Sequence, residues 1–314
     1  MALNESEYAQ LFSLKGGYPQ LQQLLSLRKF TQQLSLDTAL HTNPSAGNWH
    51  SRARGRGLDF AEVRLYQAGD DIRSIDWRVT AKTQKTHTRL FTQERERPII
   101  LAADLRSDMF FGSVNCFKSV SCAAVMSALS WIALGAKDRV GGVVIGDESH
   151  MELRPKASRK VVLSYIHYLD EYAKVLKSPV AAAQKQNLDQ LLTKLNRVTK
   201  PGSALYIASD FHDIATVNTG LIAKLSQHNQ VTFILISDPM EWQLPADANL
   251  LISDGVGIDS LGDNANLNIM QQRVAKLESV CKPFNIEILP LSTADNIIDV
   301  LQRRFSGARK RWLK

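Results

Sequence analysis

Cysteine is scarce in this chain of 314 residues, and its spacing excludes two common ways of stabilising a fold. Cys116, Cys122 and Cys281 match neither a zinc-ligand spacing nor an even disulfide framework. We therefore expect reduced, mostly buried thiols in a reducing compartment, with the cytoplasm as the location. The stretch from Met1 to Gln23 also lacks the basic start, apolar run and cleavage site of a secretory leader, so secretion is not expected.

Long apolar runs are nearly absent. The longest uncharged run spans Ser119 to Ala136, which approaches the length of a membrane-spanning helix. Serines dilute it and it follows a predicted strand, so it is typical of a buried helix in an α/β domain. We therefore expect no membrane span.

Short catalytic motifs are missing as well. The sequence has no Gly-x-x-x-x-Gly-Lys-Ser/Thr loop to hold nucleotide phosphates, no Gly-x-Ser-x-Gly elbow, no His-Glu-x-x-His pair and no Gly-x-Gly-x-x-Gly turn. We therefore expect a protein that is not an enzyme and that leaves any ATP hydrolysis to a partner.

Acidic residues are absent from the C-terminal end, although the chain contains 31 in all. The last twelve residues carry six positive charges, at Arg303, Arg304, Arg309, Lys310, Arg311 and Lys314, so the rest of the chain is close to neutral despite the net charge of +7. This distribution argues against a nucleic-acid partner. The alternative, in which the tail binds nucleic acid, predicts a steep salt dependence that disappears when residues 309–314 are deleted.

Hydrophobic periodicity divides the chain into four parts. Residues 1–48 have helically spaced leucines and predict an N-terminal helical extension. Residues 49–97 are turn-rich, with a strand-like stretch at 86–91, and predict a small β-containing subdomain. Residues 98–305 are expected to form the main α/β domain, and residues 306–314 a basic tail.

Strands and helices alternate along residues 98–305, which predicts a doubly wound, mostly parallel sheet with helices on both faces. The expected strands are 99–104, 140–145, 151–153 at an edge, 205–208, 231–236, 250–253 and 286–289. The expected helices are 117–134, 159–175, 187–196, 214–228, 267–281 and 294–305.

In sheets of this class the ligand site lies beyond the carboxyl ends of the strands. Two loops at such ends carry polar residues, and we expect the loops to meet. The first contains Asp104, Arg106, Ser107 and Asp108, and the second contains Ser209, Asp210, His212 and Asp213.

Two long motifs carry a family resemblance. One is GRGLDFAEVRLYQAGDDIRSIDWRVTAKT, from Gly55 to Thr83, and the other runs from ERERPII through an apolar strand to ADLRSDMFFG, which ends at Gly112. Their order and spacing resemble the domain of unknown function 58 family, von Willebrand A-like proteins usually encoded beside MoxR-type AAA+ ATPases. The resemblance implies a von Willebrand A-like fold. It also implies a non-catalytic adaptor that acts with a MoxR-type AAA+ ATPase to remodel, assemble or mature a client protein complex.

The resemblance further implies a metal site, which this sequence alters. Von Willebrand A domains usually hold a divalent cation with an Asp-x-Ser-x-Ser loop after the first strand, together with an Asp from a later loop. Here Asp104 matches the first position, and Arg106 and Asp108 replace the two serines. Ser209 and Asp210 resemble the later loop.

Arg106 is the important departure, because a guanidinium stands where a neutral hydroxyl would face the metal. We hypothesise that Arg106 replaces the metal and bridges Asp104, Asp108 and Asp210 through charge-assisted hydrogen bonds, so that no cofactor is needed. In a second interpretation Arg106 turns outward and two or three of the carboxylates hold Mg²⁺ through water, which opens the alternative of a metal-dependent hydrolase. In a third, these acids only satisfy loop amides and helix N-termini.

Charged and aromatic residues interleave within residues 49–97 and form what we call the platform. Its members are Arg56, Asp59, Arg64, Tyr66, Asp70, Asp71, Arg73, Asp76, Trp77 and Arg78. Nearly balanced charge favours ion pairs over a phosphate-binding track. The platform either binds a protein partner or locks the subdomain against the main sheet, and the sequence leaves both interpretations open.

Overall fold

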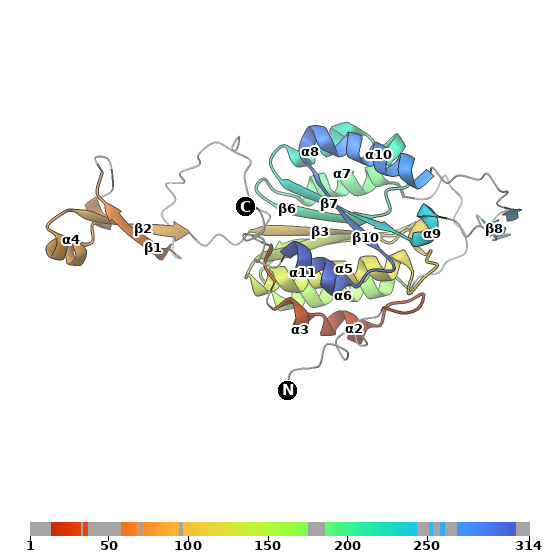
Figure 1. Cartoon of the computed structure of the whole chain (residues 1–314), viewed down its shortest axis with the longest axis horizontal. Coiled ribbons are helices and arrows are strands. Elements are labelled where there is room, and N and C mark those ends of the chain that lie inside the picture. Colours follow the sequence, from red (N-terminus) through yellow and green to blue (C-terminus); the bar gives the residue numbers. More distant parts are fainter. Residues whose placement is uncertain are drawn as a thin grey trace. The chain divides into compact units, whose positions relative to one another are not determined.

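A computed structural model describes residues 14–32, 34–36, 58–67, 70, 72–93, 97–174, 186–243, 251–253, 258–260 and 269–305 of the chain. The chain divides into two units, whose helices and strands are labelled in Figure 1. Met1–Leu40 and Arg97–Lys314 form the first, which we call the main unit. His41–Glu96 forms the second, the inserted unit.

The main unit is built on one six-stranded sheet, whose order is β10-β7-β6-β3-β4-β5. Its strands are β3 (Pro98–Asp104), β4 (Arg139–Ile145), β5 (His150–Lys156), β6 (Ala204–Ser209), β7 (Gln230–Ser237) and β10 (Glu287–Ser292). All neighbours are parallel except β4 and β5, which pair antiparallel at one edge. The expected mostly parallel sheet is confirmed. The chain winds outward from β3 in one direction and from β6 in the other, so the carboxyl ends of β3 and β6 lie side by side where the winding reverses.

Helices cover both faces of this sheet (Figure 1). One layer contains α5 (Lys118–Gly135), α6 (Arg159–Tyr172) and α11 (Ile297–Phe305), and the other contains α7 (Leu188–Val198), α8 (Thr219–Ser226) and α10 (Ile269–Cys281). Strand β3 shows why two layers form: Ile99, Leu101 and Ala103 are buried in one apolar cluster, whereas Ile100 and Ala102 are buried in the other. Because both faces exclude water, the strand is a continuous apolar run in the sequence.

Two short helices, α2 (Leu21–Ser26) and α3 (Arg28–Thr31), pack against the layer that contains α5 and α6. Leu24, Leu27 and Leu36 are buried in the same apolar cluster as α5. The indole Nε1 of Trp131 in α5 donates to the carbonyl oxygen of Leu24 at 3.4 Å. The helically spaced leucines of the N-terminal segment therefore complete the core of the main unit.

Helix α5 has an unusually apolar sequence for a helix of a layered α/β domain. Within the described ranges it is the single helix with the length and composition to cross a membrane, and 89% of that window is buried inside the structure. The sheet, α6 and the N-terminal helices surround it. The protein core therefore accounts for its apolar composition.

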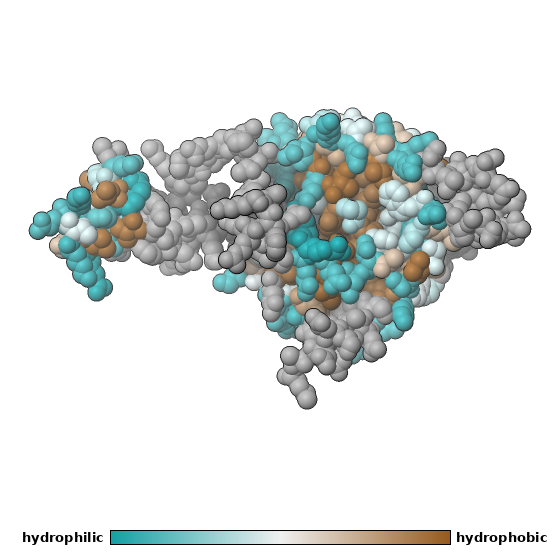
Figure 2. All heavy atoms as spheres, viewed as in Figure 1, coloured by the Kyte–Doolittle hydropathy of each residue, from teal (hydrophilic) through white to brown (hydrophobic). Residues whose placement is uncertain are grey.

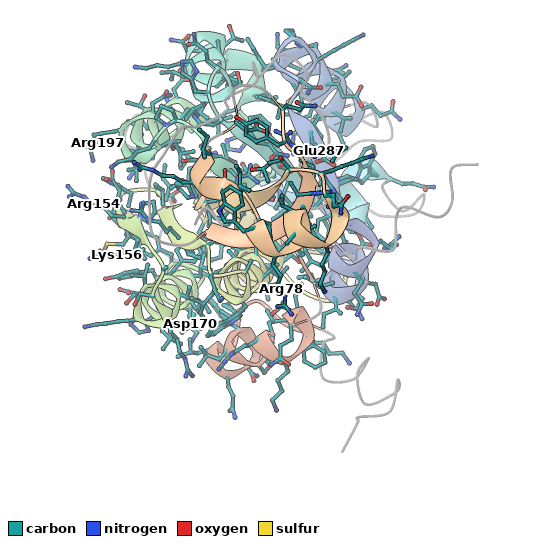
Figure 3. The ribbon with its side chains drawn as sticks, turned by 90° about the vertical axis from the view of Figure 1, so that its left-hand side faces the viewer. Arg78, Arg154, Lys156, Asp170, Arg197 and Glu287 are labelled. Atoms are coloured by element: carbon teal, nitrogen blue, oxygen red, sulfur yellow. The ribbon has the colours of Figure 1, made fainter. Side chains whose placement is uncertain are left out.

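Both edges of the main sheet carry features that discourage pairing with another strand. Edge strand β5 bears charged side chains, and Figure 3 shows Arg154 and Lys156 there, on the same side as Arg197 of α7, which pairs with Glu152 of β5 at 2.6 Å. Edge strand β10 contains the exposed Pro290, which has no backbone N–H to donate. Figure 2 shows apolar side chains between α10 and α11, where β10 lies in Figure 1.

The inserted unit contains an antiparallel hairpin of β1 (Leu58–Leu65) and β2 (His87–Gln93), with η2 (Ile72–Ser74) and α4 (Trp77–Thr83) between the strands. The strand expected at 86–91 corresponds to β2. Asp76 explains where α4 begins, because its carboxylate accepts from the backbone N–H groups of Arg78 at 3.0 Å and Val79 at 3.1 Å.

Two expected elements differ in the structure. The strand expected at 250–253 is β8 (Leu251–Ser253), which pairs with β9 (Ile258–Ser260) in a separate two-stranded sheet. The helix expected at 214–228 is split into η5 (Ile214–Thr216) and α8, because the Asn218 side chain accepts from the N–H of Gly220 at 3.0 Å and starts a new helix. A short apolar run does not identify the sheet that a strand joins, and a capping residue inside a helical pattern restarts the helix.

Candidate functional site

The candidate site lies at the carboxyl ends of β3 and β6. Asp104 is the last residue of β3 and Ser209 is the last residue of β6, and both are fully buried. The Ser209 hydroxyl donates to Asp104 Oδ2 at 2.6 Å. The structure therefore brings the two predicted loops together and joins them by a buried hydrogen bond.

Arg106 connects the loop after β3 to the loop after β6. Its Nε and Nη2 donate to Asp104 Oδ1 at 2.8 Å and Oδ2 at 2.6 Å, which makes a bidentate ion pair. Its Nη1 donates to Asp213 Oδ2 at 2.9 Å and to the carbonyl oxygen of Gln186 at 3.1 Å. Burial lowers the pKa of Arg106, but the charge and hydrogen bonds of Asp104, and then those of Asp213, outweigh burial and raise it. The guanidinium is therefore a buried positive charge shared by two carboxylates.

The other two carboxylates of the hypothesis lie elsewhere. Arg106 does not bridge Asp108 and Asp210, because Asp213 and the Gln186 carbonyl oxygen take its remaining N–H donors. Asp108 lies in the short helix η3 (Ser107–Met109) and is exposed, and the Ser107 backbone N–H donates to Asp147 Oδ1 at 2.9 Å. The outward orientation of Arg106 in the second interpretation is also wrong, since its side chain is only 3% exposed.

Asp210 has a cation of its own. The Nζ of Lys118, the first residue of α5, lies 2.7 Å from Asp210 Oδ2 and 3.0 Å from Glu241 Oε1. Burial lowers the pKa of Lys118, but the charges of Asp210 and Glu241 outweigh burial and raise it. Arg273 Nη1 lies 3.4 Å from Glu241 Oε1. A second buried ion pair thus lies beside the first, between the start of α5 and the short helix α9 (Pro239–Trp242).

His212 connects the buried part of the site to its surface. Its Nδ1 lies 3.1 Å from Asp210 Oδ1, and its Nε2 lies 3.4 Å from Asp108 Oδ2. Burial lowers the pKa of His212, but the hydrogen bond and charge of Asp210, with the charges of Asp108 and Asp213, raise it overall. Burial raises the pKa of Asp210, yet the hydrogen bond from His212 and the charge of Lys118 hold it below its ordinary value. Protonated His212 donates from both ring nitrogens and links the two acids.

A third polar group lies at the end of β7. Asp238 is fully buried and accepts from the Ser113 backbone N–H at 2.8 Å and from Thr293 Oγ1 at 2.6 Å. It also accepts from the Ser113 hydroxyl and, at 3.0 Å, from the Met240 N–H at the start of α9. Asp238 therefore joins the loop before α5, α9 and the residues after β10 into one carboxyl-end rim of the sheet.

Sequence reasoning missed Lys118, Glu241 and Asp238. The sequence does contain a signal for Lys118, because this single charged residue directly precedes an uncharged run that predicts a buried helix. The segment Asp-Pro-Met-Glu from Asp238 to Glu241 is a helix-capping signature, and the structure has the capping box. Neither signal identifies the partner of the buried charge, which depends on the tertiary fold.

The donor set does not suit the Mg²⁺ site that the resemblance implies. Both oxygens of Asp104 accept from Arg106, and Oδ2 also accepts from Ser209. Asp210 Oδ2 accepts from Lys118, and Oδ1 contacts His212. A divalent cation would need these lone pairs and would lie beside two buried positive charges. In the part of the chain that the structure describes, no group of three or more His, Cys, Asp or Glu side chains is placed to hold a metal ion.

The platform is held together by contacts within the inserted unit. Arg64 Nη2 lies 2.7 Å from Asp70 Oδ1, and Tyr66 donates to the Asp70 carbonyl oxygen at 3.4 Å. Asp76 caps α4, and Trp77 at its start is 66% exposed. Arg73 lies in η2, the backbone N–H of Arg78 donates to Asp76, and Asp59 lies in β1. Arg56, Asp71, the side chain of Asp59 and residues 306–314 of the predicted tail lie outside the described residues.

Comparison with known proteins gives one family match. The profile of the family described as "Protein of unknown function DUF58" matches residues 62–275, from β1 into α10. Uncharacterized proteins of Mycobacterium bovis and of two Mycobacterium tuberculosis strains are each 27% identical to this chain over 237 residues, which is 75% of this chain and 71% of each relative.

One similar solved structure is titled "Crystal Structure of Uncharacterized Membrane Spanning Protein from Vibrio fischeri". It is 15% identical, with a TM-score of 0.25, and the match covers 67% of this chain and 98% of that chain. The expected cytoplasmic location does not agree with that title and is withdrawn. The physical reason is that reduced thiols argue against an oxidising compartment but do not separate a free cytoplasmic protein from one attached to a membrane.

Proposed function

The chain belongs to the family described as protein of unknown function DUF58, and from this premise we propose that it is a non-catalytic adaptor with a von Willebrand A-like fold. It acts with a MoxR-type AAA+ ATPase in remodelling, assembling or maturing a client protein complex. The matched residues 62–275 include parts of both units, so the family assignment applies to the inserted unit as well as to the main unit. The sheet order, with its winding reversal between β3 and β6, supports the von Willebrand A-like assignment.

One observation carries the proposal: the two acidic centres at the rim are neutralised by side chains of the chain itself. Arg106 is shared by Asp104 and Asp213, and Lys118 is shared by Asp210 and Glu241. Charges held this way fix the two loops that carry them, and no metal is needed to order these loops. Such loops suit recognition of a partner, because recognition favours groups that are already in position before binding.

The contact face that we assign to the ATPase is formed by residues 104–108 and 209–213. Asp108 and His212 are its accessible members, and the groups behind them are fixed by Arg106. Charged side chains at the edge of an interface mainly govern the rate and specificity of association. A charge reversal at Asp108 should therefore weaken complex formation and leave the fold intact.

The test is co-purification and ATPase stimulation with a MoxR-type ATPase encoded in the same genome. We expect the wild-type chain to bind the ATPase and change its turnover, and Asp108→Lys to lose most of this effect. Glu278→Lys, an exposed acid near the end of α10, is the matched control and should behave as the wild type. Absence of binding and of any change in turnover would contradict the proposed partnership.

The metal-dependent hydrolase alternative is tested separately. Calorimetric titration of the purified protein with Mg²⁺ and Mn²⁺ should show no tight binding, because Arg106 and Lys118 already occupy the carboxylates. Tight binding that Asp104→Ala abolishes, with metal-dependent turnover of phosphoesters, would establish the hydrolase instead. Nucleic-acid binding through residues 309–314 stays a prediction.

A further inference from the structure

Four large apolar side chains are exposed at the carboxyl-end rim of the main sheet. They are Phe111 and Val114 in the loop before α5, Trp242 at the end of α9 and Ile269 at the start of α10, with exposures of 40%, 46%, 42% and 47%. In Figure 1 α9 and the loop leading into α5 lie at the same end of the sheet. We call these four residues the apolar rim.

Contacts within the rim place three of the four side chains around one charged centre. Lys118 Nζ lies 5.9 Å from the centroid of the Phe111 ring and 3.0 Å from Glu241 Oε1, and Trp242 follows Glu241 in α9. Arg273, one helical turn after Ile269 in α10, also reaches Glu241. Helices α9 and α10 are in direct contact. Phe111, Trp242 and Ile269 therefore lie around one charged centre, and Val114 lies three residues after Phe111 in the same loop.

Hydrogen bonds order the loop that carries Phe111 and Val114. The Ser113 backbone N–H donates to the Asp238 carboxylate, and the Lys118 backbone N–H donates to the Phe111 carbonyl oxygen at 2.8 Å. A Cβ atom at Gly112 would lie 2.2 Å from the carbonyl oxygen of Cys116, so the loop is folded closely on itself. Because the loop is already ordered, a partner that docks on it loses little binding free energy to ordering it.

The charges around the apolar rim are mainly acidic. Asp108, Asp147, Glu148, Asp213 and Asp295 lie in the loops at this end of the sheet and are exposed or half-buried. Three cations there, Arg106, Lys118 and Arg273, are each bound to a carboxylate. A fourth, the exposed Lys15, precedes Gly16, whose N–H donates to the carbonyl oxygen of Asn115 in the loop before α5. The basic side chains of Arg154, Lys156 and Arg197 lie toward the other end, where Lys156 pairs with Val140 near the start of β4 (Figure 3). An acidic field around an apolar surface attracts positively charged ligands and repels anionic ones.

We propose that the apolar rim is the docking site for a basic amphipathic segment of a protein partner. Apolar side chains of the segment cover Phe111, Val114, Trp242 and Ile269, and its Lys or Arg side chains face the surrounding acids. This deepens the proposed function and rests on it, since it specifies the chemistry by which an adaptor holds its ATPase or its client. The acidic surroundings disfavour phosphate, nucleic acid and anionic lipid surfaces.

The test uses the full chain and three labelled synthetic peptides of about 18 residues, long enough for a helix. The first carries Leu on one face and Lys on the other, the second replaces Lys by Glu, and the third replaces Leu by Ser. Fluorescence anisotropy should show binding of the Leu/Lys peptide, with affinity at least about tenfold lower for the other two.

Substitutions in the chain locate the binding site. Trp242→Ser and Ile269→Ser should each weaken binding of the Leu/Lys peptide about tenfold, as loss of an apolar anchor does. Leu163→Ser is the matched control, because Leu163 on α6 is also exposed, at 37%, and lies outside the apolar rim. All three positions are exposed, and circular dichroism checks that the variants stay folded.

Three results would overturn the inference: no binding of the Leu/Lys peptide, equal binding of the Lys/Ser peptide, or binding that neither rim substitution weakens. The inference and the proposed function fail in different ways. If the peptide binds at the apolar rim but no MoxR-type ATPase binds the chain, the adaptor role with that ATPase fails and the docking site stands. If the ATPase binds and the rim substitutions leave peptide binding unchanged, the docking site fails alone.

Discussion

Asp104 and Asp213 depend on the guanidinium of Arg106, which neutralises both carboxylates in the buried site. Removing the guanidinium leaves Asp104 and Asp213 facing each other across a buried position, with hydrogen bonds unmade. Breaking a buried pair by removing one partner costs about 3–5 kcal/mol. We expect Arg106→Met to lower the free energy of unfolding by that amount in a urea titration. The control Arg154→Met, on the exposed edge strand β5, should change it by less than about 0.5 kcal/mol.

His212 should make the stability of the site depend on pH. Its folded-state pKa is raised above the ordinary value of about 6.5, so its contribution is fully present below that pH and is lost as pH rises through the folded pKa. The stability difference between wild type and His212→Gln should therefore be largest in mildly acidic buffer and vanish at alkaline pH. NMR titration of the ring provides the direct measurement, and an observed pKa below about 6.5 would contradict the assigned contacts with Asp210 and Asp108.

At the scale of residues, the sequence predicted where the site lies better than it predicted which charged side chains pair within it. Strand ends are visible in the apolar pattern, so the loops carrying Asp104 and Asp210 could be placed at one rim. Which carboxylate a long cationic side chain reaches depends on distances between loops. Arg106 therefore pairs with Asp213, while Asp210 takes the ammonium of Lys118 from the start of a helix.

Strand β4 approaches its neighbours so closely that Gly142 leaves no room for a Cβ atom. A Cβ at Gly142 would lie 2.3 Å from the Leu101 carbonyl oxygen and 2.7 Å from the Tyr165 ring, and the Tyr165 hydroxyl itself donates to Leu101 at 3.1 Å. Gly142→Ala should therefore destabilise the main unit by about 1–3 kcal/mol through overpacking. Gly135→Ala, at the end of α5 with open space around it, should be neutral or slightly stabilising in the same thermal melt. Equal melting temperatures for the two variants would contradict the close approach of β4, β3 and α6.

At the scale of elements, the long alternating pattern was sufficient to predict the strands of the main sheet. β3, β6 and β7 are buried on both faces, so their apolar runs stand out from the amphipathic helices around them. The exceptions are local. β8 has only three residues and joins a separate hairpin, and Asn218 restarts a helix that periodicity alone would continue.

At the scale of the whole molecule, the covering of both sheet faces follows from alternation, but the order of the strands and the place of the N-terminal segment do not. The N-terminal leucines are predicted to form a helix, and only the fold shows that Leu24, Leu27 and Leu36 fill the core beside α5. Sequence periodicity predicts which face of a helix or strand is buried, but it does not predict which other element covers that face. For the same reason the apolar composition of α5 cannot by itself distinguish a core helix from a membrane helix.

The composition of the two apolar clusters predicts how the chain responds to deletion. The buried members of both clusters come from the main unit, and none comes from the described residues of His41–Glu96. Replacing His41–Glu96 by a short Gly/Ser linker should therefore leave a folded main unit, with a cooperative thermal melt and the far-UV signature of an α/β domain. Deleting residues 1–36 is the contrasting variant, because it removes three buried leucines that each contribute about 1.5–3 kcal/mol. We expect the second deletion to melt at a much lower temperature than the first. The reverse order would mean that the inserted unit stabilises the sheet, and that the two units do not form separate cores.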